Sequence, residues 1–175
     1  WEPIVQAYDR WGRRCGTAGA LMTHVAGPFR GSQWAFFGVE DVELPAIPEF
    51  RQRVLVPLLE RMRAGVYFTR ITADLACYRR GEAPRVTLVA ENFGKAVFSG
   101  SFHSVLRQVD FRVSSEANRG KDTPVIRETN GDIPSLSPNE KFEAHIELQH
   151  QPLSEGLYEM EVTLQTADGQ VLDYG

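Results

Sequence analysis

The chain has 175 residues, of which 42% are apolar and 24% charged, and its formal net charge is −4. This composition is typical of a globular protein with a hydrophobic core. It excludes a disordered chain, because β-branched and aromatic residues are plentiful. The sequence also contains no run of about 20 apolar residues, the length that a membrane-spanning helix needs, so we expect no membrane span.

The charge is unevenly distributed along the chain. Residues 1–80 carry 11 basic and 8 acidic side chains, whereas residues 81–175 carry 8 and 15. The acidic half would repel phosphate, and the basic half shows no cluster of Arg or Lys interleaved with aromatic residues, so we expect no nucleic-acid partner. The chain starts at Trp1 rather than at Met, which indicates a processed product or a piece of a longer protein.

The first third of the chain predicts a mixture of helix and strand. Apolar residues at helical spacing predict a helix over residues 2–14. They are Ile4, Val5, Tyr8 and Trp11. Residues 17–26 and 34–39 are short apolar runs that predict buried strands. Residues 51–64 predict an amphipathic helix whose apolar stripe covers a core, with a late start or a kink at Pro57.

From Val66 onward the pattern changes to alternation of apolar and polar residues, which predicts strands with one buried and one solvated face. The clearest runs are residues 85–91, 109–113, 142–148 and 158–164. Turn signals separate the strands, among them Asn130-Gly131-Asp132 and the hairpin mark Asp168-Gly169. The whole predicts a mainly β fold. An immunoglobulin-like β-sandwich of about seven antiparallel strands, residues 69–175, follows a mixed α/β segment, residues 1–68.

Short polar phrases recur at the strand ends of the second half. They are Ala73-Asp74, Tyr78–Glu82, Glu91–Gly94, Leu136–Glu140, Leu153–Tyr158 and Ala167–Leu172. Their order resembles that of the immunoglobulin-like accessory domains attached to glycoside hydrolases and other extracellular proteins. The resemblance covers residues 70–175 and implies a secreted or periplasmic protein.

The first half adds a second resemblance, to the closing units of a (β/α)8 glycoside hydrolase barrel. It implies that residues 17–26 and 34–39 are barrel strands whose C-terminal ends face an active site. Two such units cannot close a barrel. The chain would then be the tail of a larger enzyme, or these elements would pack on the sandwich.

Three residues near the second apolar run are candidates for contact with a glycan. The side chain of Trp34, with Phe36 and Phe37 beside it, either stacks on a sugar ring or belongs to the core. Glu40 and Asp41 follow this run. Adjacent residues at the end of a strand point to opposite faces, so the two carboxylates are not expected to form the catalytic pair of a glycosidase, and at most one would serve in that role. Glu40 and Asp41 are either rim contacts to a glycan or, with Glu43, part of a solvated loop entrance.

The remaining reactive side chains form no recognisable constellation in the sequence. Cys15 and Cys77 are expected to be small buried side chains. The four histidines are His24, His103, His145 and His150, and none has the spacing of a metal ligand set. We therefore expect no metal and no cofactor.

Three functional hypotheses remain open. The first is a non-catalytic accessory region of a carbohydrate-active protein, which would be a glycoside hydrolase if the chain is part of a larger enzyme. The second is a stand-alone module for protein–protein interaction or adhesion. The third, a self-contained small hydrolase, has the least support, because no nucleophile or pair of catalytic carboxylates emerges.

Overall fold

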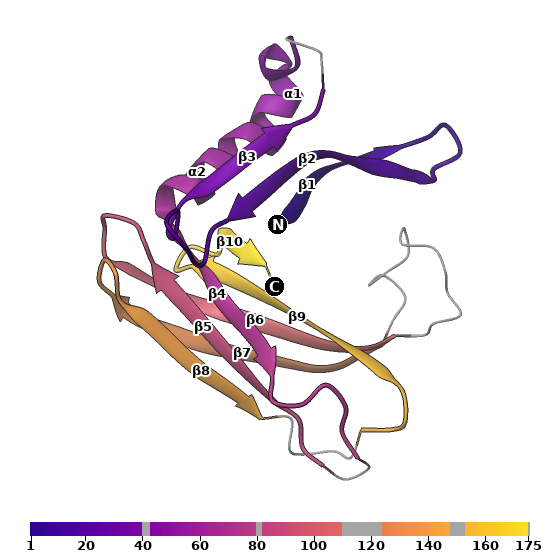
Figure 1. Ribbon diagram of the computed structural model, residues 1–175, viewed down its shortest axis with the longest axis vertical. Coiled ribbons are helices and arrows are strands. Elements are labelled where there is room, and N and C mark those ends of the chain that lie inside the picture. The colour runs from indigo at the N-terminus through magenta and orange to yellow at the C-terminus, as the bar shows by residue number, and fades with distance from the viewer. Residues whose placement is uncertain (40–42, 80–81, 110–123, 148–152, 175) are drawn as a thin grey trace. The chain divides into compact units, whose positions relative to one another are not determined.

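The computed structural model describes residues 1–39, 43–79, 82–109, 124–147 and 153–174, and the chain divides into two compact units, Trp1–Arg63 and Ala64–Gly175 (Figure 1). The fold is mainly β, in agreement with the predicted fold class. Within the described residues no helix is both long and apolar enough to cross a membrane.

Unit 1 contains a three-stranded antiparallel sheet and a helical segment. The strands are β1 (Glu2–Tyr8), β2 (Arg14–Thr23) and β3 (Gln33–Phe37), in the order β1-β2-β3. The helical turns are η1 (Leu44–Ala46), α1 (Pro48–Phe50), the π-helical η2 (Arg51–Leu55) and α2 (Val56–Ala64). The helix packs on one face of the sheet, where the rings of Phe37 and Phe50 lie edge to face at 5.7 Å.

The predicted helix over residues 51–64 is confirmed, and so is its irregularity at Pro57. The backbone N–H of Val56 donates to the carbonyl of Arg51, five residues earlier, so a π-helical turn precedes the regular α-helix. Pro57 has no backbone N–H, and its ring crowds the carbonyl of the residue four positions earlier. The wider π turn lies where an α-helix would meet this conflict.

The helix predicted over residues 2–14 is wrong, because this segment is a β-hairpin. β1 pairs with β2, and the register shifts three times within β1. Because each irregularity shifts which residues face inward, the sequence of β1 lacks the two-residue period of a regular strand. Ile4, Val5 and Tyr8 therefore have a spacing that is typical of a helix. The turn is closed by Gly12, whose φ of 76° favours glycine.

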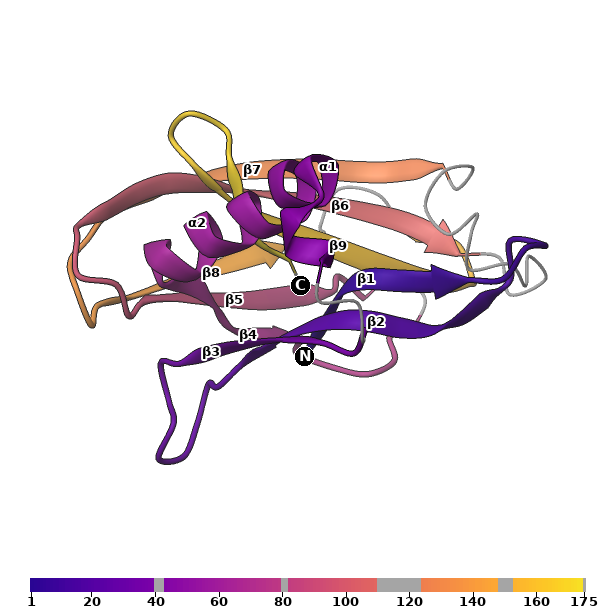
Figure 2. The same ribbon diagram turned by 90° about the horizontal axis from the view of Figure 1, so that it is seen from above.

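The prediction of two barrel strands is also wrong. Residues 17–26 and 34–39 overlap β2 and β3, and these strands are antiparallel neighbours, with Leu21 opposite Ala35 and Met22 opposite Trp34. Consecutive strands of a (β/α)8 barrel are parallel and need a helix between them. Here a short loop joins the two strands as a hairpin instead (Figure 2).

Unit 2 is a β-sandwich of seven strands in two antiparallel sheets. One sheet has the order β4 (Val66–Ala73), β5 (Arg85–Asn92), β8 (Lys141–Glu147); the other has the order β10 (Val171–Tyr174), β9 (Leu157–Thr166), β6 (Phe98–Val109), β7 (Val125–Leu136). Both sheets contribute to one core. Its largest members include Leu88, Phe102, Leu106, Ile146, Leu164 and Leu172. At one side the Asp173 carboxylate accepts a hydrogen bond from the Phe68 N–H at 2.7 Å, which joins β10 to β4.

The alternating runs predicted at 85–91, 142–148 and 158–164 correspond to β5, β8 and β9, and the Asp168-Gly169 hairpin joins β9 to β10. The run at 109–113 lies outside the described residues except for Val109.

The turn predicted at Asn130-Gly131-Asp132 is wrong. These residues lie within β7, where Gly131 is opposite Phe102. A Cβ at Gly131 would come within 2.3 Å of the Phe102 ring, so the glycine provides space for a buried aromatic side chain rather than a change of chain direction.

Candidate functional site

Trp34, a predicted contact residue, lies in β3 with its side chain on the opposite face of the sheet from Phe37 and the helix. Phe36 shares this face, and Met22 lies beside Trp34 on the neighbouring strand. The three side chains are 41%, 50% and 37% exposed, respectively. The other two predicted contact residues, Glu40 and Asp41, lie outside the described residues.

Four rings form a connected cluster on the β2–β3 hairpin, which we call the ring cluster: His24, Phe29, Trp34 and Phe36. The ring centroid of Trp34 lies 4.7 Å from that of His24, 5.3 Å from that of Phe29 and 6.3 Å from that of Phe36, each in an edge-to-face arrangement. Phe29 is itself 54% exposed. Such contacts fix the rings relative to one another while leaving aromatic surface in contact with solvent.

The loop between β2 and β3 holds its part of the ring cluster through its own backbone. The N–H of His24 donates to the carbonyl of Ser32 at 2.9 Å, and the N–H of Gly31 donates back to the carbonyl of His24 at 2.8 Å. The Ser32 hydroxyl donates to the carbonyl of Phe29 at 2.7 Å. Gly27 and Gly31 both have positive φ, which lets the loop turn sharply. Phe29 is therefore positioned against Trp34 by an ordered loop.

The ring cluster offers two kinds of interaction to a ligand. The exposed faces of Trp34 and Phe36 can stack on apolar C–H surface. The Nε2 atom of His24 is buried and has no hydrogen-bond partner within the described residues, so it is available to a hydroxyl group that enters the cluster.

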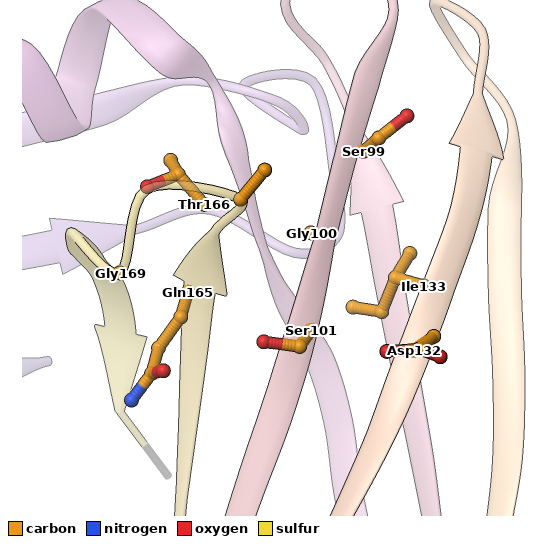
Figure 3. Close-up of a pocket in the computed structure, with 9 residues that line it drawn as sticks. Ser99, Gly100, Ser101, Asp132, Ile133, Gln165, Thr166 and Gly169 are labelled. Carbon is orange, nitrogen blue, oxygen red and sulfur yellow. The ribbon is translucent and has the colours of Figure 1, made fainter.

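A second candidate is a shallow depression of about 430 Å³ in unit 2, drawn in Figure 3. Ser101 lies at its centre, with Asp132 opposite it on β7 and Gln165 opposite it on β9. Thr166 and Gly169 of the β9–β10 hairpin complete one side. Asp132 is the one carboxylate of this lining, so the depression offers hydrogen bonds but not the pair of carboxylates used in glycoside hydrolysis.

Two polar residues of the phrases that resemble accessory domains stabilise turns. The Asp74 carboxylate accepts hydrogen bonds from the Tyr78 hydroxyl at 2.5 Å and from the N–H groups of Leu75 and Arg85 at 3.1 and 3.2 Å. The hydrogen bond from Tyr78 is the main cause that lowers the pKa of Asp74, whereas burial chiefly raises the pKa of Tyr78. Asp74 thus closes the loop between β4 and β5.

Asn92, in the next phrase, is fully buried and joins three segments. Its side-chain amide donates to the carbonyls of Ala96 and Leu136, both at 2.8 Å, and its side-chain oxygen accepts from the N–H of Gly94 at 2.9 Å. These bonds use both N–H donors of the amide and one acceptor position of its oxygen. The resemblance therefore rests, at Asp74 and Asn92, on residues that hold the sandwich together.

The two cysteines are free and exposed, so the prediction of buried thiols is wrong. Both lie near turns, Cys15 at the start of β2 and Cys77 in the loop after β4, where no core is available to cover them. Among the residues that the structure describes, no group of three or more His, Cys, Asp or Glu side chains is arranged to hold a metal ion.

The turn between β1 and β2 carries a cluster that the sequence analysis missed. The Arg10 guanidinium lies 4.0 Å from the centre of the Trp11 ring, and that of Arg13 lies 5.0 Å from it. We call Asp9–Arg14 the basic tip. In the basic tip, Arg residues are interleaved with an aromatic residue, an arrangement that we did not expect in residues 1–80. It was missed because the predicted helix over residues 2–14 assigned Trp11 to an apolar stripe. The Asp-x-x-Gly turn formed by Asp9 and Gly12 was the signal that could have revealed it.

Asp9 organises the basic tip. Its carboxylate accepts hydrogen bonds from the N–H groups of Trp11 and Arg13, both at 2.9 Å, and from the Arg13 guanidinium at 2.7 Å. The backbone hydrogen bond from Arg13 is the largest cause that lowers the pKa of Asp9 below its ordinary value of 3.8.

The pKa of Asp9 predicts how the tip responds to acid. Because it is lowered on folding, the stabilising contribution of the carboxylate is present above pH 3.8 and is lost only as the pH falls through the lower, folded value. An NMR titration should therefore show the amide signals of Trp11 and Arg13 changing with a shared midpoint below pH 3.8. Asp9→Asn is expected to abolish this transition. A midpoint at or above 3.8 would contradict the prediction.

Comparisons with known proteins give no family. No protein-family model and no curated protein matches the chain. Solved structures to which it is similar include glycoside hydrolases. A β-glucuronidase from Bacteroides uniformis has 13% identity and a TM-score of 0.44 over 63% of this chain, and a β-glucosidase 3B from Thermotoga neapolitana in complex with glucose has 15% and 0.40 over 63%. The sporulation control protein Spo0M from Bacillus subtilis has 16% and 0.39 over 63%.

The chain spans 14% of the length of this β-glucuronidase, 15% of the β-glucosidase and 46% of Spo0M. At these identities and TM-scores the similarities carry no argument about function.

Proposed function

We propose that the chain is a non-catalytic accessory region of a carbohydrate-active protein, in which the β-sandwich is structural and the ring cluster of unit 1 contacts a glycan. The observation that carries this proposal is the ring cluster itself. Trp34 and Phe36 present aromatic surface to solvent on the sheet face that does not pack against the helix. A secreted or periplasmic location accompanies the proposal, on the sequence resemblance alone.

A glycan fits this surface for a chemical reason. Sugar rings present C–H groups on one face and hydroxyl groups at the edge. An exposed indole or phenyl ring covers the C–H face, and a nearby imidazole nitrogen can exchange a hydrogen bond with a hydroxyl. Trp34 and His24 supply these two functions from adjacent strand ends, 4.7 Å apart. We propose Glu40 and Asp41 as additional polar contacts at the rim.

Trp34→Ala is expected to weaken binding of a neutral polysaccharide, such as xylan or a β-glucan, by about tenfold, because it removes the central aromatic ring of the cluster. Affinity electrophoresis and isothermal titration calorimetry on the full 175-residue chain measure this. Tyr174→Ala is the control, since it removes an aromatic side chain that is 48% exposed and belongs to unit 2. Equal binding by the Trp34→Ala variant and the parent chain would refute the site.

The alternative is a protein–protein interaction module, and one observation favours it. Met22 lies beside Trp34 and extends the exposed apolar surface beyond the rings. Flexible methionine side chains adapt to apolar protein surfaces better than to sugars. Met22→Ser separates the two functions: it should leave glycan affinity within about twofold, but should weaken a protein contact through this face.

A further inference from the structure

The basic tip lies at the opposite end of the unit 1 sheet from the ring cluster. In an antiparallel meander, consecutive hairpins turn at opposite ends of the shared strand, and Figure 2 shows the two turns of unit 1 on opposite sides. β2 has 10 residues, so the two turns are separated by roughly 30 Å of strand. The basic tip is therefore a separate surface, with its own chemistry.

The conformation of the hairpin loop does not account for all of the side chains at the basic tip. The N–H of Gly12 donates to the carbonyl of Asp9, and the N–H of Asp9 donates to the carbonyl of Arg13, which closes a short hairpin loop. Asp9 and Gly12 meet the conformational needs of this loop. The two residues between them, Arg10 and Trp11, are not required by the turn, and Trp11 is 64% exposed. Binding residues are concentrated on such ordered loops.

The charges of the tip favour an anion. Arg10 and Arg13 both lie at the Trp11 ring, and the nearby carboxylate of Asp9 is already bound to Arg13. Arg10 has no carboxylate partner among the residues that the structure describes. Its guanidinium group lies 4.0 Å from the centre of the Trp11 ring. A guanidinium offers two parallel N–H donors that match a carboxylate, whereas the indole offers an apolar face.

We propose that the basic tip binds an acidic sugar residue of a polysaccharide, with the Arg10 guanidinium on the carboxylate and the exposed part of the Trp11 indole, which Arg10 and Arg13 leave uncovered, on the sugar's C–H face. A uronate unit carries both features on one six-membered ring, at the short separation that Arg10 and Trp11 provide. The inference rests on the proposed function, since it names an anionic glycan as the ligand of a carbohydrate-associated chain.

A nucleic acid fits the chain less well. It presents a continuous line of phosphates, and binding it requires a long basic surface. The basic tip is confined to one turn, and residues 81–175 carry a net excess of seven acidic side chains over basic ones. A single carboxylate attached to a sugar ring needs only the local arrangement that is present.

The test compares polygalacturonate with neutral xylan by calorimetry on the full chain. Arg10→Ala and Trp11→Ala are each expected to weaken polygalacturonate binding about tenfold and to leave xylan binding unchanged. Arg10→Lys, which keeps the charge but loses the paired donors, should lie between Arg10→Ala and the parent. Arg53→Ala, which removes an equally charged and 79% exposed side chain from the helix, is the matched control.

The outcomes separate this inference from the proposed function. If the tip variants bind polygalacturonate as the parent does, while Trp34→Ala loses xylan, the inference fails and the proposed function stands. If neither polysaccharide binds, both fail. If inorganic polyphosphate or single-stranded DNA binds the tip more tightly than polygalacturonate at 150 mM salt, the tip recognises charge alone and the inference fails.

Discussion

Asn92→Ala is expected to lower the free energy of unfolding of the β-sandwich by roughly 3 kcal/mol, because it would leave one buried carbonyl, that of Leu136, and two partly buried backbone groups without their partner. The carbonyls of Ala96 and Leu136 and the N–H of Gly94 all bind the Asn92 amide. Asn92 is fully buried, so water cannot replace the side chain without entering the core. Chemical denaturation followed by NMR signals of unit 2 measures the change.

Asn130→Ala is the matched control for this experiment. Asn130 also accepts a hydrogen bond with its side chain, from His103 at 2.6 Å, but on an exposed face of β7. Its loss should cost less than about 1 kcal/mol, because solvent replaces the partner. A cost for Asn92→Ala no larger than that for Asn130→Ala would show that the buried amide does not join the three segments as the structure indicates.

The strands that the sequence predicted well are those with one solvent-exposed face and one buried face. Polar or charged residues, including Glu143 and Glu161, alternate with apolar ones along most of β8 and β9, so exposed and more buried side chains alternate along these strands. β6 was not predicted. It is a central strand of its sheet, and Gly100 and Ser104 lie between its core residues. Because neither has a large apolar side chain, the apolar–polar alternation that predicts a strand is interrupted in β6.

The candidate sites show the same limit. The sequence placed Trp34 on a strand with Phe36 and Phe37 and left open whether these rings are exposed or belong to the core. It could not show that the loop brings Phe29 and His24 against the Trp34 ring. Those contacts depend on the positive φ values at Gly27 and Gly31, which a sequence pattern does not specify. The basic tip was hidden for a different reason, because β-bulges erased the alternation that would have revealed the hairpin.

Unit 1 offers the second large effect, at the ion pair between β1 and α2. The Arg61 guanidinium donates two hydrogen bonds to the Glu2 carboxylate, at 3.0 and 2.5 Å. The Arg61 side chain is 8% exposed and that of Glu2 is 30% exposed. Glu2→Ala is therefore expected to destabilise unit 1 by about 3 kcal/mol, since it removes both of these charge-assisted hydrogen bonds from a largely buried guanidinium.

A double-mutant cycle separates the loss of the ion pair from the loss of packing. Arg61→Met alone should cost about 1 kcal/mol, because Glu2 can hydrate and the methionine fills much of the vacated volume. The double variant Glu2→Ala/Arg61→Met should be more stable than Glu2→Ala, because the guanidinium whose two hydrogen bonds to Glu2 are lost is then absent as well. Chemical denaturation followed by NMR signals of unit 1 gives the coupling energy, expected at about 2 kcal/mol. A coupling below about 0.5 kcal/mol would mean that apolar contacts, rather than this ion pair, hold the helix on the sheet.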